Sequence, residues 1–258
     1  MNTYLNEQFG LVGRVACITG AAAGLGFAIA RALGRAGARI VITDLDEDRC
    51  KQAVDQLRVD GIDATSIVFD VSKAEAVQRE FDELAERHWI PDILVSNAGN
   101  QNRQPVTEMS AEAWQSLFNV HVNGAFNCAK AVIPRMKTKG FGRIILMSSV
   151  AGQACMPGIA AYASAKGAIA AFTRALGVEY GGDGITTNAL APGFIRTQFT
   201  EGLQTREGFD DFLQTAVPLK RWGEPDDVAP AVVYLASRAG AFVNGHVLAI
   251  DGGMLARM

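Results

Sequence analysis

Tyr162 and Lys166 lie four residues apart in the small-residue run AYASAKGAIAAF (161–172), so on a helix they share one face. A free tyrosine has a pKa of about 10, and one positive charge about 4 Å away contributes on the order of 4 kcal/mol at an effective dielectric of 20. Lys166 can therefore lower the pKa of Tyr162 toward neutrality and make it a general acid/base beside a hydride carrier. The alternative is an exposed Tyr–Lys pair, because this spacing alone also arises by chance.

A serine at the end of a β-rich run supports the catalytic interpretation. The segment MSSVAG places Ser149 13 residues before Tyr162. A hydroxyl at a strand end, followed by a loop into the tyrosine helix, can converge on the same substrate oxygen. Ser148 is the rival, but side chains alternate along a strand, so Ser148 should face the other side.

The first β-rich run ends in a glycine-rich turn, TGAAAGLG (19–26), with glycines at positions 20, 24 and 26. Glycine there lets a pyrophosphate approach closely, and the following helix N-terminus offers N–H groups to that anion. A glycine turn without a ligand is the alternative. Asp44, 18 residues after Gly26 at the end of the second β-rich run, favours the dinucleotide interpretation because an acid there accepts hydrogen bonds from a ribose.

The charge of Asp44 also predicts NAD rather than NADP, because it would repel the extra phosphate of NADP. No Arg or Lys lies between Thr19 and Gly26 to bind that phosphate. Arg39 precedes its strand and should lie at the other end of the sheet. A plain helix N-cap is the alternative role for Asp44, although Asp46 is the better cap candidate.

The elements that position these residues alternate between strands and helices. Strands that are apolar on both faces and separated by helices imply a parallel sheet covered on both sides, in a doubly wound α/β fold. The polar segment 198–222 interrupts the alternation of strands and helices and is expected to form a lid. The expected strands are 14–19, 39–43, 65–69, 92–96, 143–148, 184–190 and 246–250, and the expected helices are roughly 24–36, 46–58, 73–88, 111–138, 161–180 and 226–237.

Composition argues against several other classes of function. The chain has 258 residues, 49% of them hydrophobic, with 27 acidic and 24 basic side chains, and no basic stripe suggests nucleic acid or a membrane surface as a partner. We expect no signal peptide in MNTYLNEQFGLVGR, and no apolar run approaches the roughly 18 residues of a membrane span. The four cysteines have no metal-ligand spacing, which indicates reduced thiols, no metal site and a cytoplasmic protein.

Together these segments resemble the short-chain dehydrogenase/reductase family nearly from end to end. TGAAAGLG matches its TGxxxGxG motif, residues 97–99 its NAG motif, Ser149 its catalytic serine, 162–166 its YxxxK motif and APGFIRT (191–197) its PG segment. The resemblance implies one NAD(P)-binding Rossmann domain over residues 1–258, with a seven-stranded parallel sheet and the lid at about 198–222.

The same resemblance implies the residues of a cofactor site. Asp70 and Val71 would hold the adenine, the NAG motif would line the ribose path, the PG segment would hold the carboxamide, and Lys166 would also bind the nicotinamide ribose. The candidate cofactor-binding residues are Gly20, Gly24, Leu25, Gly26, Asp44, Leu45, Asp70, Val71, Asn97, Ala98, Gly99, Tyr162, Lys166, Pro192, Gly193, Ile195 and Thr197.

One position departs from the family pattern. The family usually carries an Asn in the long helix after the NAG strand, and aligning WQSLFNVHVNGAF on that pattern puts His121 there. Asn123, two residues on, would lie about 200° around the helix. A neutral imidazole can hold the water that the Asn usually holds in a proton relay to Lys166. His121 is thus a candidate catalytic residue; the alternative is a packed histidine at a helix distortion.

Within the family, NAGNQNRQP (97–105) and the tail FVNGHVLAIDGGMLARM (242–258) resemble gluconate 5-dehydrogenases and related sugar-acid oxidoreductases. Arg103 can clamp a substrate carboxylate with two parallel hydrogen bonds, or it is a solvated loop arginine. Ser149, Tyr162 and Gln153 are further candidates for substrate contact, Gln153 through sugar hydroxyls. Three aromatic residues in or beside the lid can cover the sugar or simply pack: Phe209, Phe212 and Trp222.

We therefore expect an NAD-dependent oxidoreductase that acts on a secondary alcohol or ketone of a sugar acid or polyol. One alternative is a 3-oxoacyl thioester reductase, against which Asp44 counts because such reductases mostly use NADPH. A second is a dinucleotide-binding sensor, against which the intact Ser, Tyr and Lys set counts. Family likeness also implies that helices 111–138 and 161–180 pair across a two-fold axis in a homodimer or homotetramer.

Overall fold

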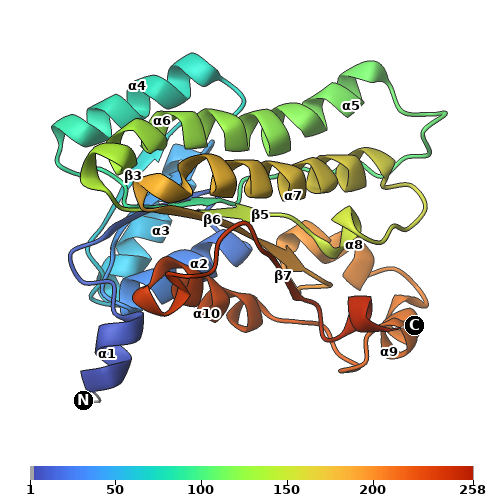
Figure 1. The fold of residues 1–258 in the computed structure, drawn as a ribbon. Helices are drawn as coiled ribbons and strands as arrows, with labels where there is room; N and C mark the ends of the chain where they lie inside the picture. Colours follow the sequence, from blue (N-terminus) through green and yellow to red (C-terminus); the bar gives the residue numbers. More distant parts are fainter. Residues whose placement is uncertain (1–2, 258) are drawn as a thin grey trace.

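The computed structural model describes residues 3–257, and its centre is a seven-stranded parallel sheet with strand order β3-β2-β1-β4-β5-β6-β7 (Figure 1). The chain builds outward from β1 to β3, then crosses back to place β4 on the other side of β1. In such a sheet, ligands bind outside the carboxyl ends of the strands where the order reverses. The strands are β1 Val15–Thr19, β2 Arg39–Asp44, β3 Ala64–Val68, β4 Ile93–Ser96, β5 Gly142–Met147, β6 Ile185–Pro192 and β7 Val247–Ile250.

Helices cover both faces of the sheet, which confirms the predicted doubly wound fold (Figure 1). One face carries α2 Gly24–Arg35, α3 Glu47–Val59 and α10 Pro225–Ala236, and the other carries α4 Ala74–Glu86, α6 Gly124–Lys139 and α7 Ala160–Tyr180.

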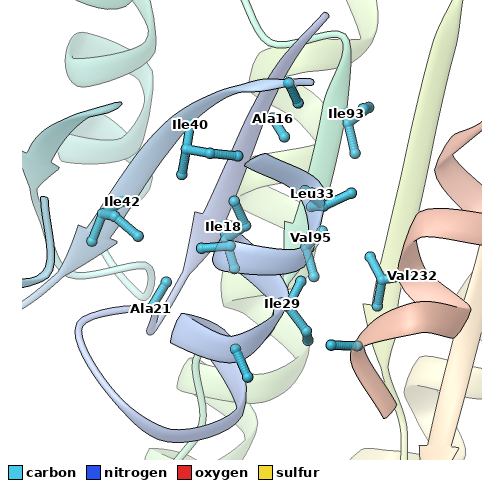
Figure 2. Close-up of a cluster of buried hydrophobic side chains, with 14 of the residues drawn as sticks. Ala16, Ile18, Ala21, Ile29, Leu33, Ile40, Ile42, Ile93, Val95 and Val232 are labelled. Carbon is cyan, nitrogen blue, oxygen red and sulfur yellow. The ribbon is translucent and has the colours of Figure 1, made fainter. Parts of the chain in front are cut away.

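Alternation along each strand divides the buried side chains between two cores. Ile18 of β1 packs with Ile29 and Leu33 of α2 in the core that Figure 2 shows. Its neighbour Cys17 points to the opposite core, with Val132 of α6. Because both faces of each central strand are buried, the strands read as continuous apolar runs.

The predicted helix 111–138 is not one helix. It divides into α5 Ala111–Phe118, a π-helical turn Asn119–Asn123, and α6. Gly124 begins α6 where the backbone passes close to Val71; a Cβ there would lie 2.7 Å from Val71 Cγ2. A π turn inserts one residue into the α-helical repeat, and such turns often occur at functional sites.

The segment 198–222, the predicted lid and called the lid below, carries no strand and folds as short helical pieces. They are a 3-10 turn Gln198–Thr200, α8 Glu201–Gln204 and α9 Phe209–Ala216. The segment has an apolar core of its own, which includes Phe209, Leu213 and Trp222 and packs against Phe194.

The remaining elements are short, and the first of them has no counterpart among the expected helices. α1, Thr3–Phe9, buries none of its residues, so it leaves no hydrophobic periodicity in the sequence. Within residues 3–257, no helix is both long and apolar enough to cross a membrane. The 3-10 turns outside the lid are Val150–Gly152, Gly181–Asp183, Arg238–Gly240 and Met254–Ala256.

Candidate active site

A cavity of about 610 Å³ opens at the carboxyl ends of the central strands. It runs from the ends of β2 and β3 past the glycine turn after β1 to the N-terminal half of α7, under the first part of the lid. The location agrees with the point at which the strand order reverses. Every candidate cofactor-binding residue lines this cavity: Gly20, Gly24, Leu25, Gly26, Asp44, Leu45, Asp70, Val71, Asn97, Ala98, Gly99, Tyr162, Lys166, Pro192, Gly193, Ile195 and Thr197.

The glycine turn has the geometry of a phosphate cradle. Gly20 and Gly24 have φ angles of +63° and +57°, a region that residues with a Cβ rarely adopt. A Cβ on Gly26 would lie 2.3 Å from the carbonyl oxygen of Gly20. The N-cap of α2, Ala23, has no side chain that caps the helix, so the first N–H groups of α2 remain available for an anion. These features fit a dinucleotide pyrophosphate.

Asp44 has two functions at the end of β2. Its Oδ1 accepts a hydrogen bond from Leu45 N at 2.8 Å, and its Oδ2 accepts one from Ala22 N at 3.3 Å. Asp44 thereby holds the glycine turn while its carboxylate lines the cavity. The N-cap of α3 is Asp46, as predicted, which accepts a hydrogen bond from Arg49 N at 3.0 Å.

Asn97 holds the turn in place through its side-chain amide nitrogen. Its Nδ2 donates to the carbonyl oxygens of Thr19 and Gly20, both at 2.9 Å. The Thr19 Oγ1 in turn accepts from the backbone N–H groups of Asn97 and Ala98, both at 3.0 Å. Asn97 therefore borders the cavity chiefly as a link between β1 and β4.

At the other end of the cavity, Tyr162 and Lys166 project from α7 beside the end of β5. Lys166 Nζ lies 5.5 Å from the centroid of the Tyr162 ring and donates to the carbonyl oxygen of Met147 at 2.6 Å. Ser149 Oγ accepts from Ala151 N at 3.1 Å and lines the cavity. Ser148 is engaged elsewhere, since its hydroxyl donates to the Lys166 carbonyl oxygen at 2.9 Å.

The proton affinities at this end differ from the expectation that Lys166 lowers the pKa of Tyr162. Burial raises the pKa of Tyr162, and only a hydrogen bond from Ser149 and the charge of Arg103 oppose that rise. Lys166 is itself so buried that its pKa falls to about 7. The spacing on a helix predicted that Lys166 lies near Tyr162 with a positive charge. It did not predict the burial of Lys166, which disfavours that charge and lowers the pKa of the lysine.

His121 lies within the π turn and is buried against Tyr162. The two ring centroids are 5.5 Å apart, edge to face. Gly99 makes room for the imidazole, because a Cβ there would lie 2.6 Å from His121 Cε1. The Nε2 atom lies 2.8 Å from the Asn100 carbonyl oxygen and 3.3 Å from the Asn100 backbone nitrogen, and Nδ1 is buried with no partner among the described residues. The shorter contact favours the tautomer in which Nε2 donates to the carbonyl oxygen, and this tautomer leaves Nδ1 as a hydrogen-bond acceptor.

His121 is held neutral over the physiological range. Burial, and secondarily the charge of Lys166, lower the pKa of His121 from 6.5 to about 3. The histidine thus occupies a helix distortion, as the packing alternative supposed, and it also faces the catalytic candidates.

His121→Asn is expected to protect the protein against acid. Because the folded-state pKa of about 3 lies below the ordinary 6.5, the unfolded chain binds the extra proton in this window. The stability that neutral His121 contributes is complete above pH 6.5 and is lost as the pH falls toward 3. Urea denaturation at a series of pH values should show that the wild type loses on the order of 2–4 kcal/mol more than the variant.

The matched control is His88→Asn. His88 is exposed and has a φ of 59°, a conformation that asparagine tolerates. It should keep the pH slope of the wild type. Equal slopes for His121→Asn and the wild type would contradict a buried, neutral imidazole.

The predicted substrate residues separate into two groups. Arg103 lines the cavity near Tyr162, and its Nε donates to Gln101 Oε1 at 3.2 Å. Burial lowers the pKa of Arg103, and nearby Arg206 adds to this effect. Within residues 3–257 Arg103 makes no ion pair with a carboxylate.

Ser149 and Tyr162 also line the cavity, and the remaining substrate candidates lie outside it. Gln153 does not line the cavity. Phe209, Phe212 and Trp222 pack around Phe194 at ring separations of 5.1 to 6.0 Å, so they support the lid instead of facing the cavity.

The sequence did not predict that Phe199 and Arg49 line the cavity, because only tertiary contacts bring them there. Phe199, in the lid, lies 6.3 Å from Tyr162 between ring centroids. Arg49, in the first turn of α3, donates to Gln198 Oε1 at 3.3 Å across the cavity. The only feature of the sequence that pointed to Arg49 is its position five residues after Asp44.

Known proteins share this architecture. A family model described as enoyl-(acyl carrier protein) reductase matches residues 20–255. Gluconate 5-dehydrogenase of Gluconobacter oxydans is 39% identical, with 96% of this chain and 97% of that protein covered. A 3-oxoacyl-(acyl-carrier-protein) reductase of Pseudomonas aeruginosa is 36% identical, with 95% and 98% covered.

Among solved structures, gluconate 5-dehydrogenase from Burkholderia cenocepacia in complex with NADP and tartrate has a TM-score of 0.96. It is 38% identical, and 98% of this chain and 99% of that chain are covered. The likeness extends over the glycine turn, the catalytic candidates and the lid. The chain belongs to the short-chain dehydrogenase/reductase family.

Proposed function

We propose that this protein is an NAD-dependent oxidoreductase that transfers a hydride between nicotinamide and a secondary alcohol or ketone of a sugar acid or polyol. The observation that carries the proposal is one continuous cavity, with a dinucleotide cradle at one end and Ser149, Tyr162 and Arg103 together at the other. The likeness to gluconate 5-dehydrogenases supports the substrate class.

The residues divide the chemistry between them. Bound nicotinamide would supply the hydride acceptor. Tyr162 exchanges the hydroxyl proton of the substrate, and Ser149 positions the substrate oxygen and stabilises the tyrosinate by a hydrogen bond. Lys166 would hold the nicotinamide ribose, and the positive charge of Arg103 favours the ionised form of Tyr162.

His121 would complete the proton path. Its Nδ1 atom is a buried acceptor without a partner among the described residues, and a buried acceptor is costly to leave unpaired. We assign it a water molecule between the cavity and Lys166. The imidazole stays neutral in this role, so it adds no limb to the pH profile near 6.5.

Asp44 is proposed to favour NAD. The carboxylate would accept hydrogen bonds from the adenosine ribose and repel a phosphate there. Asp44→Asn keeps a hydrogen-bond acceptor for the glycine turn but removes the charge. Its kcat/KM for NADP relative to NAD should rise by about tenfold or more, because about 1.4 kcal/mol corresponds to a factor of ten.

The measurement is the initial rate with each cofactor at saturating substrate. The NADP bound to the Burkholderia relative makes the comparison necessary, and Arg49 is a nearby cation that could serve a phosphate. A wild type that prefers NADP, with a ratio that Asp44→Asn leaves unchanged, would contradict the proposal.

Arg103 is proposed to bind the substrate carboxylate. Charge-assisted hydrogen bonds contribute about 1.5–3 kcal/mol, so Arg103→Ala should raise the KM for D-gluconate by about 10- to 100-fold. Sorbitol, which has the same chain length but no carboxylate, should show a much smaller change. Arg103→Lys keeps the charge but not the planar fork, and an intermediate KM is expected. Equal effects on both substrates would reject the sugar-acid class.

The alternative thioester reductase predicts efficient reduction of a 3-oxoacyl thioester with NADPH. The likeness to the Pseudomonas reductase keeps this assay necessary. A dinucleotide-binding sensor without catalysis predicts no turnover in either assay.

We also propose that the protein forms a homodimer or homotetramer through α5, α6 and α7. Phe126 of α6 is 49% exposed, and its ring lies 6.4 Å from that of Phe172 on α7. Exposed aromatic rings on adjoining helices are typical of a protein interface. Light scattering tests the assembly, and Phe126→Glu should shift it toward the monomer.

A further inference from the structure

Gln101 connects the substrate end of the cavity to the lid. It follows β4 and lines the cavity. Its Nε2 donates to the carbonyl oxygen of Phe199, at the start of the lid, and its Oε1 accepts from Arg103 Nε. One side-chain amide therefore joins two segments that are almost a hundred residues apart in the chain.

We propose that Gln101 is a positioning residue that fixes the orientation of Arg103 for a substrate carboxylate and couples that orientation to the lid. The inference rests on the proposed function, because it assumes a carboxylated substrate. It adds a residue that neither the glycine turn nor the Ser, Tyr and Lys motifs include.

The first argument is the geometry of the guanidinium group. A carboxylate can bind arginine at the side, through Nε and one terminal nitrogen, or at the end, through both terminal nitrogens. Gln101 occupies Nε, and no other hydrogen bond from the Arg103 side chain occurs within residues 3–257. The end of the fork is therefore the face left for a bidentate carboxylate.

The second argument is the contact with the lid. The Phe199 carbonyl oxygen binds Gln101, while the Phe199 ring packs 6.3 Å from Tyr162 between centroids. Because one amide binds both Arg103 and Phe199, it fixes the carboxylate site relative to the wall beside the reactive hydroxyl. The distance between the carboxylate site and the reactive hydroxyl would determine which carbon of a sugar acid lies beside Tyr162.

Electrostatics explain why a neutral amide, that of Gln101, joins Arg103 to Phe199. Arg103 faces Tyr162 and the charge of Arg206, with no carboxylate partner within residues 3–257. An acid in place of Gln101 would pair with Arg103 and compete with the substrate. A neutral acceptor orients the guanidinium without neutralising it.

The test compares Gln101→Glu and Gln101→Met with the wild type, using D-gluconate and sorbitol. Glu keeps the acceptor for Arg103 but adds the competing charge, and Met keeps the length but loses both hydrogen bonds. For gluconate, KM should rise by about tenfold or more in Gln101→Glu and by about three- to tenfold in Gln101→Met. The corresponding change for sorbitol should be at least several-fold smaller in both.

A double-mutant cycle separates positioning from a general role in folding. In an Arg103→Ala background, Gln101→Met should change the KM for gluconate by less than about twofold, because the guanidinium group that Gln101 orients is absent. A gluconate effect that persists without Arg103, or that appears equally with sorbitol, would overturn the inference.

The proposed function is tested separately by Arg103→Ala in otherwise wild-type protein. If Arg103→Ala abolishes a preference for gluconate while Gln101→Met does not weaken it, the function stands and the role of Gln101 fails. If the wild type shows no preference for gluconate over sorbitol, the sugar-acid substrate class and the role of Gln101 both fail.

Discussion

Tyr162→Phe is expected to lower kcat by about 10³-fold or more, within the range of general acid–base catalysis. The substitution removes one hydroxyl and keeps the buried ring that packs against His121 and Phe199. The hydroxyl of Ser148 is engaged elsewhere, because it donates to the backbone carbonyl oxygen of Lys166. Binding of the reduced dinucleotide, followed by fluorescence, should change by less than about tenfold.

Tyr180→Phe is the matched control. Tyr180 ends the same helix, outside the cavity, and loses the same hydroxyl. It should retain nearly the full kcat of the wild type. A Tyr162→Phe variant with more than about a tenth of the wild-type kcat would show that another group moves the proton, because the loss would fall short of general acid–base catalysis.

Lys166→Met is expected to abolish most of the turnover and yet stabilise the protein without cofactor. Burial lowers the pKa of Lys166 from 10.5 to about 7. At pH values between these two, the unfolded chain binds the proton that folded Lys166 releases. The wild type therefore gains stability as the pH rises from about 7 to 10.5.

The stabilising effect of the substitution should be largest below about pH 7 and should shrink as the pH rises toward 10.5. The pKa difference sets an upper bound of about 5 kcal/mol, from which loss of the hydrogen bond to Met147 subtracts. Thermal melts over this pH range measure the trend, with a Tm gain of about 2–4 °C per kcal/mol in a chain of this size.

Lys51→Met serves as the control for the loss of a lysine. Lys51 is exposed on α3 and pairs with Glu47 at 2.8 Å. The stability of Lys51→Met relative to the wild type should not change between pH 7 and 10.5. If Lys166→Met is no more stable than the wild type at any pH, Lys166 is hydrated in the folded protein.

The sheet could be predicted because its central strands are buried on both sides. Ile18 and Cys17 enter opposite cores, so β1 is an unbroken apolar run between turns. The apolar pattern did not predict the π turn at His121, because a one-residue insertion leaves the apolar repeat on either side nearly unchanged; only the packing alternative for His121 supposed a helix distortion there. The core of the lid was missed in part because its helices are too short for a periodic pattern.

The positions of the catalytic candidates could be predicted where the residues are local to a motif, since all three line one cavity. Tyr162, Lys166 and Ser149 belong to one strand, loop and helix, and their spacing was sufficient to bring them together. The hydrogen bonds from Lys166 to Met147 and from Gln101 to Phe199 depend on tertiary packing. The same holds for the proton affinities, because burial raises the pKa of Tyr162 above its ordinary value.

The most direct test of the proposed function is the absorbance of reduced nicotinamide as purified protein oxidises D-gluconate and other aldonates with NAD or NADP. The ketone product is quantified by NMR in the same samples. The account predicts turnover of an aldonate with NAD, with equal amounts of ketone and NADH. No turnover of any aldonate with either cofactor, together with reduction of a 3-oxoacyl thioester by NADPH, would contradict it.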